Sequence, residues 1–277
     1  MSAITHATSE ISAGLALRPC PLCGSAGSRK PVLRRDPWQV VGCLECGMVF
    51  IGSEIPYEAQ AREHDWEEEW RKDTIRRKRE QPVMVFLSRC TRPFLPHTHG
   101  RLLSQTLHYA RAGKLVDFGC SDASFLARAR KYFRVTGIDL SPRGVEIARS
   151  RVGAEAILEG PVVEVAENRL PANEFDVVTQ LGYIEHEWRP QSALRAAHRL
   201  LKPGGLTVIK TPNYASWNRW IRGEKWCGYR LPAHCNYFTP ETIEKMLRQC
   251  GFEPLPRPWR DRLPTSDSLW LAARKPA

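Results

Sequence analysis

The sequence predicts an α/β fold built on a doubly wound parallel sheet. Four short apolar runs, LVDF, VTGIDL, FDVVTQL and LTVIK, alternate with segments of helical periodicity after Lys114. Buried parallel strands are continuous apolar runs of this kind, and strands that alternate with helices are typical of βαβ units. With 277 residues, 42% of them hydrophobic, the chain is long and apolar enough to bury such a sheet.

Composition divides the chain into four segments. Residues 1–17 are rich in Ser, Ala and Thr and are predicted to be a flexible tail. Residues 18–52 contain two cysteine pairs and are predicted to be a small ribbon. Residues 53–112 are charged and are predicted to form a helical cap and substrate region. Residues 113–277 contain the four strands and form the predicted core, with an aromatic insertion at 213–238.

The second half of the chain contains sequence signals for the beginnings and ends of helices. Ser141 and Thr239 each stand directly before a proline, which predicts an N-cap followed by a proline at the first helical position. Gly251 follows a helical pattern and suits a left-handed helix end. The sequence KPGG at 202–205 is predicted to be a turn between a helix and a strand.

The chain carries an excess of positive charge. Lys and Arg number 41 against 30 Asp and Glu, a formal net charge of +11. This excess is compatible with nucleic acid, an anionic small molecule or an acidic carrier as a partner and does not choose among them. The basic run RKDTIRRKR at 71–79 is either an anchor for phosphate or a solvated helix face.

The sequence predicts neither a membrane span nor a secretory signal. No apolar run approaches the roughly 18 residues that a spanning helix needs. The N-terminus lacks the basic and apolar regions of a signal peptide. The nine cysteines are an odd number and cannot all form disulfides. A reducing, cytoplasmic location is therefore expected.

Two C-x-x-C pairs predict a structural zinc site. Each pair is followed by a glycine, Gly24 or Gly47, which lets the chain curl so that two thiolates face one side of a tight bend. Four thiolates fill a tetrahedral site and leave no open position for catalysis. The alternative is a set of free or redox-active thiols. The predicted ligands are Cys20, Cys23, Cys43 and Cys46.

The segment KLVDFGCSDASFL predicts a strand, a loop of small residues and the start of a helix. Such a loop lets the backbone approach a ligand closely, although only Gly119 remains of a three-glycine pattern. The next predicted strand ends in Asp139, and a carboxylate there can accept both hydroxyls of a ribose. The alternative is that Asp117 and Asp139 only cap strand ends.

These motifs resemble those of class I S-adenosylmethionine-dependent methyltransferases. LVDFGCSDASFL is similar to the first motif of that family and GIDLSP to the second, while FDVVTQLGYIEH and LLKPGGLTVIKTPN resemble its fourth strand and the following region. HCNYFTPETIEKMLRQCGFE is similar to the closing segment of a bacterial subgroup that often carries an N-terminal zinc ribbon. The resemblance implies a Rossmann-like sheet of seven strands whose last strand, at 268–274, is antiparallel.

Residue by residue, the resemblance implies a cofactor site for S-adenosylmethionine. Asp117 and the loop after it would lie beside the methionine part, Asp139 would bind the ribose, and Leu140 would contact adenine or ribose. Two residues at the end of the fourth strand would lie beneath the cofactor. The implied contacts are Asp117, Gly119, Cys120, Ser121, Asp139, Leu140, Gln180 and Leu181.

Two loop positions depart from the family pattern. The second and third glycines of the family are Ser121 and Ala123 in this chain. A left-handed backbone at a non-glycine residue costs about 1–2 kcal/mol. We therefore expect weakened binding of the cofactor, and a non-catalytic domain is the alternative.

Two histidines are candidates for the general base. A methyl group on a sulfonium is already activated, so the protein must align the acceptor, exclude water and remove a proton from a hydroxyl. His186 follows the fourth strand in YIEH, and His234 lies in the aromatic insertion. Imidazole can accept a proton near neutral pH. The alternatives are a structural cap for His186 and an ordinary loop position for His234.

The insertion at 213–238 contains seven aromatic rings. Such rings either form a roof over a planar or sugar-like substrate or bury the insertion against the core. We expect the roof. The rings are Tyr214, Trp217, Trp220, Trp226, Tyr229, Tyr237 and Phe238.

The function expected from these features is methyl transfer from S-adenosylmethionine to a small molecule, at a hydroxyl of a sugar or natural-product intermediate. The substrate could carry a phosphate group or be bound to a carrier. An RNA methyltransferase is one alternative, but QLGY follows the fourth strand in place of the Asn/Asp-Pro-Pro-aromatic box that grips a base amine. A non-catalytic cofactor-binding module is the other.

Overall fold

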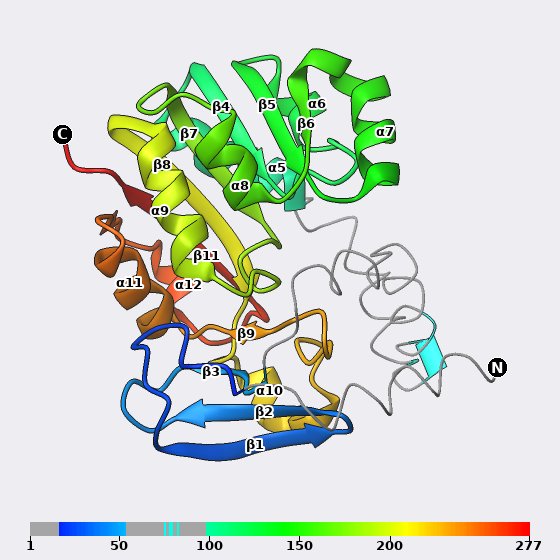
Figure 1. Ribbon diagram of the computed structural model, residues 1–277, viewed down its shortest axis with the longest axis vertical. Coiled ribbons are helices and arrows are strands. Elements are labelled where there is room, and N and C mark those ends of the chain that lie inside the picture. Colours follow the sequence, from blue (N-terminus) through cyan, green and yellow to red (C-terminus); the bar gives the residue numbers. More distant parts are fainter. Residues whose placement is uncertain (1–16, 54–74, 76–77, 80–81, 83–97) are drawn as a thin grey trace.

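The computed structural model is shown in Figure 1. It describes residues 17–53, 75, 78–79, 82 and 98–277. Nearly all of the predicted tail, most of the predicted cap and most of the basic run at 71–79 lie outside the described residues.

The larger sheet has the seven strands and the antiparallel last strand that were predicted. Its order is β10-β11-β8-β7-β4-β5-β6. The strands from β8 to β6 in this order run parallel, and β11 pairs antiparallel with β8. The strands are β4 (Gly113–Phe118), β5 (Phe133–Asp139), β6 (Ile157–Glu159), β7 (Phe175–Leu181), β8 (Leu201–Pro212), β10 (Glu253–Pro254) and β11 (Ser268–Arg274).

Helices cover both faces of this sheet. Leu115 and Val177 pack with α5, α6 and α7, whereas their neighbours Val116 and Val178 pack with α8, α9 and α11. Successive side chains of a strand point to opposite faces, so the predicted apolar runs are continuous because both faces are buried. The helices are α5 (Thr98–Tyr109), α6 (Leu126–Ala129), α7 (Pro142–Val152), α8 (Val162–Asn168), α9 (Pro190–Leu200), α10 (Trp217–Arg222), α11 (Pro240–Gln249) and α12 (Trp259–Arg262).

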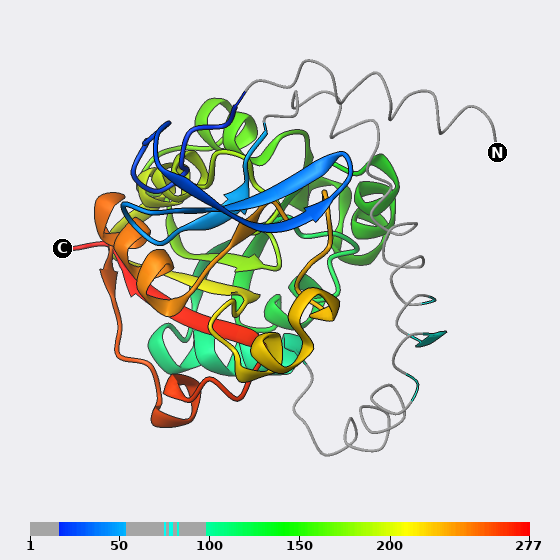
Figure 2. The same ribbon diagram turned by 90° about the horizontal axis from the view of Figure 1, so that it is seen from below.

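The N-terminal strands form a second sheet that a distant segment completes. β1 (Arg29–Arg35), β2 (Trp38–Cys43) and β3 (Val49–Ile51) pair antiparallel in sequence order. β9 (Asn236–Tyr237), from the aromatic insertion, pairs antiparallel with β3. This ribbon lies at the lower end of the molecule in Figure 1 and in front of the larger sheet when seen from below in Figure 2.

The ribbon shares its hydrophobic contacts with the rest of the protein. Met48 and Phe50 belong to the same cluster as the side chains of α9 and α11. Val49 and Ile51 belong to a second cluster with rings of the aromatic insertion, including Trp226. Among the described residues, the ribbon therefore packs on two sides against later parts of the chain instead of around a core of its own.

The predicted helix signals are confirmed at three positions. Ser141 accepts a hydrogen bond from the amide of Gly144 at the start of α7. Thr239 forms a capping box with Thr242 at the start of α11. Gly251, just beyond α11, has a φ of +86°.

The predicted turn at 202–205 is instead part of β8, which begins at Leu201. Phe175 pairs with Leu201, but Val177 pairs with Leu206, so the extra residues form an irregularity within the strand pairing. Local sequence indicates a bend here, and pairing with β7 on both sides of it keeps the segment in the sheet.

None of the helices in the described part of the chain is both long and apolar enough to span a membrane.

Candidate cofactor and acceptor site

The order of the strands changes direction at β4. The strands next to β4 are β5 on one side and β7 on the other, so the chain turns in opposite directions at this point. Ligands of open α/β sheets bind outside the carboxyl ends of the strands at such a change of direction. Asp117, the loop 119–125, Asp139 and the end of β7 meet at this edge.

Asp139 joins the loop after β4 to the start of α7. One carboxylate oxygen accepts a hydrogen bond from the amide of Ser121 at 2.7 Å, and the other accepts from the amide of Ser141 at 2.9 Å. A carboxylate has about four acceptor positions. Asp139 therefore keeps capacity for further donors, such as two ribose hydroxyls.

Asp117 is a second buried carboxylate beside Asp139. It is 2% exposed and accepts a hydrogen bond from the Thr179 hydroxyl at 2.6 Å. Burial raises the pKa of Asp117 to about 7, and the nearby charge of Asp139 acts in the same direction. Burial also raises the pKa of Asp139, against the effect of the amides that it binds. Two buried acids at one edge favour a positively charged ligand.

The loop after β4 adopts left-handed backbone where the family has glycines. The φ angles are +70° at Gly119, +48° at Ser121 and +54° at Ala123. The expected cost of about 1–2 kcal/mol therefore applies at both Ser121 and Ala123.

Gly119 also makes room for an aromatic ring that the sequence reasoning did not single out. A Cβ atom at Gly119 would lie 2.9 Å from Cδ2 of Tyr183, in the loop after β7. The Tyr183 ring meets Phe118 edge to face, and its hydroxyl donates to Glu187. The loops after β4 and β7 thus pack directly on each other.

The other predicted cofactor contacts occupy different environments. Leu140 follows Asp139 and is half-buried. Cys120 is buried, and a Cβ at Gly137 would lie 2.6 Å from its sulfur. Gln180 is fully buried, with its Nε2 3.5 Å from the Thr207 hydroxyl and its Oε1 without a partner. Leu181 is half-buried at the end of β7. Contact between these residues and a cofactor stays a prediction.

The two candidate histidines lie together. The ring centroids of His186 and His234 are 4.7 Å apart, edge to face. Glu185 joins them, since one ligand atom from each of the three residues lies within 4.8 Å of the others. A carboxylate and two imidazoles could hold a divalent cation or exchange protons. Glu185 was missed as a site residue, although its place beside His186 in YIEH was a usable signal.

His234 is held as a neutral base. It is 5% exposed, and its Nδ1 lies 2.8 Å from the carbonyl oxygen of Gly228. A carbonyl only accepts, so in the neutral ring Nδ1 carries the proton and Nε2 is unprotonated. Burial lowers the pKa of His234 well below its ordinary value, and the His186 and Arg230 charges add to this effect.

The four predicted zinc ligands converge in the ribbon. The sulfurs of Cys20 and Cys46 are 3.5 Å apart, those of Cys23 and Cys43 are 3.6 Å apart, and all four lie within 4.8 Å of one another. Tetrahedral zinc–thiolate bonds of about 2.3 Å place sulfurs about 3.8 Å apart. Left-handed glycines follow both pairs, at φ +76° for Gly24 and +75° for Gly47. These residues fit a zinc ion.

The aromatic insertion is largely a packing element. Five of its seven rings are buried, and Tyr214, Trp226, Tyr229 and Tyr237 lie in the cluster shared with the ribbon. The expectation of a substrate roof is not supported for these rings. Trp217 and Trp220 on α10 differ, with 57% and 74% of their surface exposed.

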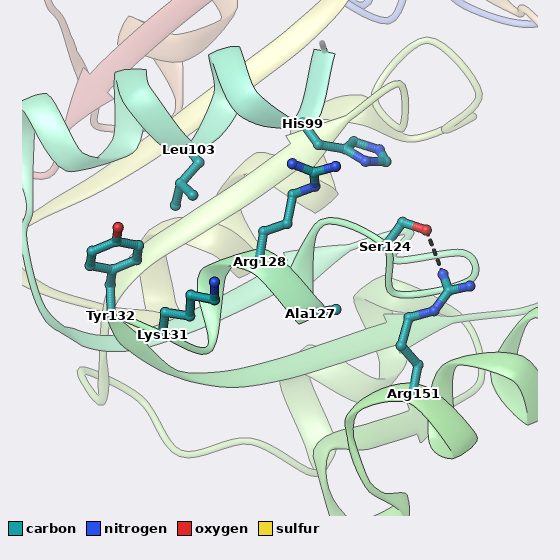
Figure 3. Close-up of a pocket in the computed structure, with 8 residues that line it drawn as sticks. All are labelled: His99, Leu103, Ser124, Ala127, Arg128, Lys131, Tyr132 and Arg151. Atoms are coloured by element: carbon teal, nitrogen blue, oxygen red, sulfur yellow. Dashed lines mark hydrogen bonds between the residues drawn. The ribbon is translucent and has the colours of Figure 1, made fainter.

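A separate cavity of about 580 Å³ lies between α5, α6 and the end of α7. Figure 3 shows Ser124 hydrogen-bonded to Arg151 on one side of this cavity, Lys131 and Tyr132 on the other, and Arg128 beneath α5. None of the predicted cofactor contacts lines it. The lining residues are His99, Leu103, Ser124, Ala127, Arg128, Lys131, Tyr132 and Arg151.

Comparison with known proteins agrees with the motifs. A family model described as a methyltransferase domain matches residues 93–256. The chain is 31% identical over 169 residues to the ubiquinone biosynthesis O-methyltransferase of Cereibacter sphaeroides, a match that covers 58% of this chain and 68% of that protein. The protein of the same name from Thiobacillus denitrificans is 28% identical over 183 residues, which cover 59% of this chain and 79% of that protein.

Two solved structures share the fold. A SAM-dependent methyltransferase from Archaeoglobus fulgidus has a TM-score of 0.52 and 17% identity, with 70% of this chain and 100% of that chain covered. An S-adenosylmethionine-dependent methyltransferase from Mesorhizobium loti has a TM-score of 0.50 and 18% identity, with 64% of this chain and 98% of that chain covered.

Replacing one ribbon cysteine tests the metal site. We expect the purified wild-type protein to contain about one zinc per chain. Cys43→Ser should lose the zinc and lower the free energy of unfolding, because metal binding stabilises a ribbon without its own core. Cys227→Ser, outside the cluster, should keep the zinc. Elemental analysis of both variants checks this, and a wild-type protein without zinc would refute the site.

Ser121→Gly should stabilise the protein slightly. Glycine removes the cost of about 1–2 kcal/mol for a left-handed backbone, which applies here at φ +48°. The greater conformational freedom of glycine in the unfolded chain offsets about 0.5–1 kcal/mol of this gain. Ala127→Gly, within α6, is the control and should destabilise by about 1 kcal/mol. Thermal unfolding compares the two, and equal destabilisation would contradict the assigned backbone strain.

Asp117→Asn should change how stability depends on pH. The pKa of Asp117 is about 7 in the folded protein and about 3.9 in the unfolded chain. The folded state therefore binds more protons between these values, and this group lowers stability as pH rises through that window. A pKa shift of this size corresponds to a change of about 4 kcal/mol in the free energy of unfolding.

Urea unfolding at pH 5 and pH 8 measures this effect. Asp117→Asn should be more stable than wild type at pH 8, with a smaller difference at pH 5. Asp36 is exposed, so Asp36→Asn should show the same difference in the free energy of unfolding between pH 5 and pH 8 as the wild type. A stability difference between wild type and Asp117→Asn that is the same at pH 5 and pH 8 would show that Asp117 is already ionised at pH 5.

Proposed function

Because the chain belongs to the class I S-adenosylmethionine-dependent methyltransferases, we propose that it transfers a methyl group to an oxygen atom of a small molecule. The observation that carries this proposal is the convergence of His186, His234 and Glu185 beyond the end of β7. The O-methyltransferase names of its relatives support an oxygen acceptor. We further propose a hydroxyl of a biosynthetic intermediate as the acceptor and a cytoplasmic location.

Asp139 and the loop after β4 would hold the cofactor. The free acceptor positions of Asp139 suit ribose hydroxyls, and the buried carboxyl of Asp117 suits the positive end of the cofactor. When bound, the cofactor supplies an activated methyl group on a positively charged sulfur. The second proposed ligand, zinc, would be held by the four ribbon cysteines and would stabilise the fold.

The histidine pair would remove the proton of the acceptor hydroxyl. His234 is neutral, and the hydrogen bond from its Nδ1 to Gly228 leaves Nε2 able to accept that proton. The His186 ring lies edge to face against it and is exposed, so it can pass a proton to solvent. Glu185 is buried beside both rings and can stabilise a positive charge on either ring when ionised.

RNA methylation is the competing function, and the net charge of +11 is the observation in its favour. Phosphate contacts make nucleic-acid binding steeply dependent on salt. Labelled S-adenosylmethionine, offered with catechol and other hydroxylated small molecules or with total RNA, separates the two functions. We expect label in a small molecule and none in RNA. Label in RNA alone would overturn the proposal.

Asp139→Ala should weaken binding of S-adenosylmethionine by about 10²-fold or more, because two charge-assisted hydrogen bonds of about 1.5–3 kcal/mol each are lost. Asp122→Asn, in the same loop and paired with Arg151, is the control and should change the Kd by less than about threefold. Titration calorimetry measures both variants. Absence of binding by the wild type at millimolar cofactor would favour a non-catalytic module.

His234→Gln and His186→Gln should lower kcat for methyl transfer by about 10²-fold or more and leave the cofactor Kd unchanged, as expected for loss of a general base. The wild-type kcat should persist below pH 6.5, because burial lowers the pKa of His234. His198→Gln, whose ring packs on Phe252, is the control. Unchanged rates in both site variants would exclude the pair as the base.

A further inference from the structure

One buried side chain of the ribbon forms hydrogen bonds to the segments that contain the two candidate histidines. Arg18 is 3% exposed, and its guanidinium donates to the carbonyl oxygens of Cys235 at 3.0 Å and Trp188 at 2.6 Å. It also donates to the Asn236 side chain at 2.9 Å. Arg18 precedes the first zinc-type cysteine pair, whereas these partners lie next to His234 and two residues after His186.

Asn236 joins the segment that contains His186 to the segment that contains His234. Its side-chain amide donates to the carbonyl oxygens of Ile184 at 3.1 Å and Glu187 at 2.6 Å. The backbone amides of Cys235 and Asn236 both donate to the carbonyl oxygen of Glu185, at 2.9 and 3.1 Å. Backbone carbonyls on both sides of His186 are thus bound by residues that directly follow His234.

The ribbon sheet holds this arrangement from the other side. The amide of Ile51 donates to the Cys235 carbonyl at 3.0 Å, and β3 pairs with Asn236 and Tyr237. The Arg18 guanidinium also lies 4.6 Å from the centroid of the Trp188 ring. A planar guanidinium with five donors can join several acceptors in fixed geometry, which lysine cannot do.

We propose that Arg18 and Asn236 are positioning residues. Through them the N-terminal ribbon holds His186 and His234 in the relative positions that proton transfer requires. This inference rests on the proposed function for its kinetic consequence only. The hydrogen bonds of Arg18 and Asn236 described above go to residues 184–188 and 235–236, so we expect the cofactor site to be independent of them. A catalytic group displaced by about 1 Å can lose about 10²-fold in rate.

Three variants test the proposal. Arg18→Met keeps an unbranched apolar stem and removes every donor. Arg18→Lys keeps the positive charge without the planar guanidinium. Asn236→Asp is isosteric and replaces the two donors to Ile184 and Glu187 with acceptors. Arg34→Met, in the same ribbon but exposed and paired with Asp36, is the matched control.

The first readout is the tautomer of His234 by ¹H–¹⁵N NMR of histidine side chains, with His186→Gln and His234→Gln for assignment. At pH 6 the wild type and Arg34→Met should show His234 as the neutral Nδ1–H form. In Arg18→Met and Asn236→Asp, His234 should become hydrated and titrate near its ordinary pKa of about 6.5, with Arg18→Lys between the two. This readout does not depend on any acceptor.

The second readout separates catalysis from binding. With catechol or another acceptor found above, Arg18→Met and Asn236→Asp should lose about 10²-fold in kcat, while the Kd for S-adenosylhomocysteine stays within about twofold and the zinc content is unchanged. Absence of methyl transfer by the wild type would refute the proposed function, and the NMR result would still decide this inference. Folded variants that keep the His234 tautomer of the wild type would overturn it.

Discussion

Asp139 is the residue on which the proposed cofactor site depends. Its two oxygens bind the amides of Ser121 and Ser141, so a single carboxylate joins the loop after β4 to the beginning of α7. Burying a charged group is unfavourable unless it is hydrogen-bonded, and these amides provide that compensation. The remaining acceptor positions lie at the edge where parallel strands diverge. The same group therefore shapes the loop and remains available to a ligand.

The ribbon and the aromatic insertion form one structural body. Each contributes strands and side chains to a common sheet and cluster. The proposed zinc ion would stabilise one part of this body and the packed rings the other. The position of His234 follows from this arrangement, because β9 begins two residues after it.

Local patterns predicted most of the methyltransferase core. Short apolar runs located β4, β5, β7 and β8, and Ser141 and Thr239 marked helix starts, because each signal depends on neighbouring residues. The pairing of β9 with β3 could not be predicted, since it joins segments far apart in the chain and involves only two residues of β9. The rings of the insertion gave an ambiguous signal, because aromatic side chains suit a substrate roof and a hydrophobic core equally. His186 and His234 were each chosen for their place after a strand, and their contact depends on β9.

A crystal structure of the protein with bound S-adenosylhomocysteine tests the central claim most directly. The account predicts the adenosine across the carboxyl ends of β4 and β5, with both ribose hydroxyls within hydrogen-bond distance of the Asp139 carboxylate. A nucleoside bound elsewhere in the protein, or a crevice that stays empty at saturating ligand, would contradict it.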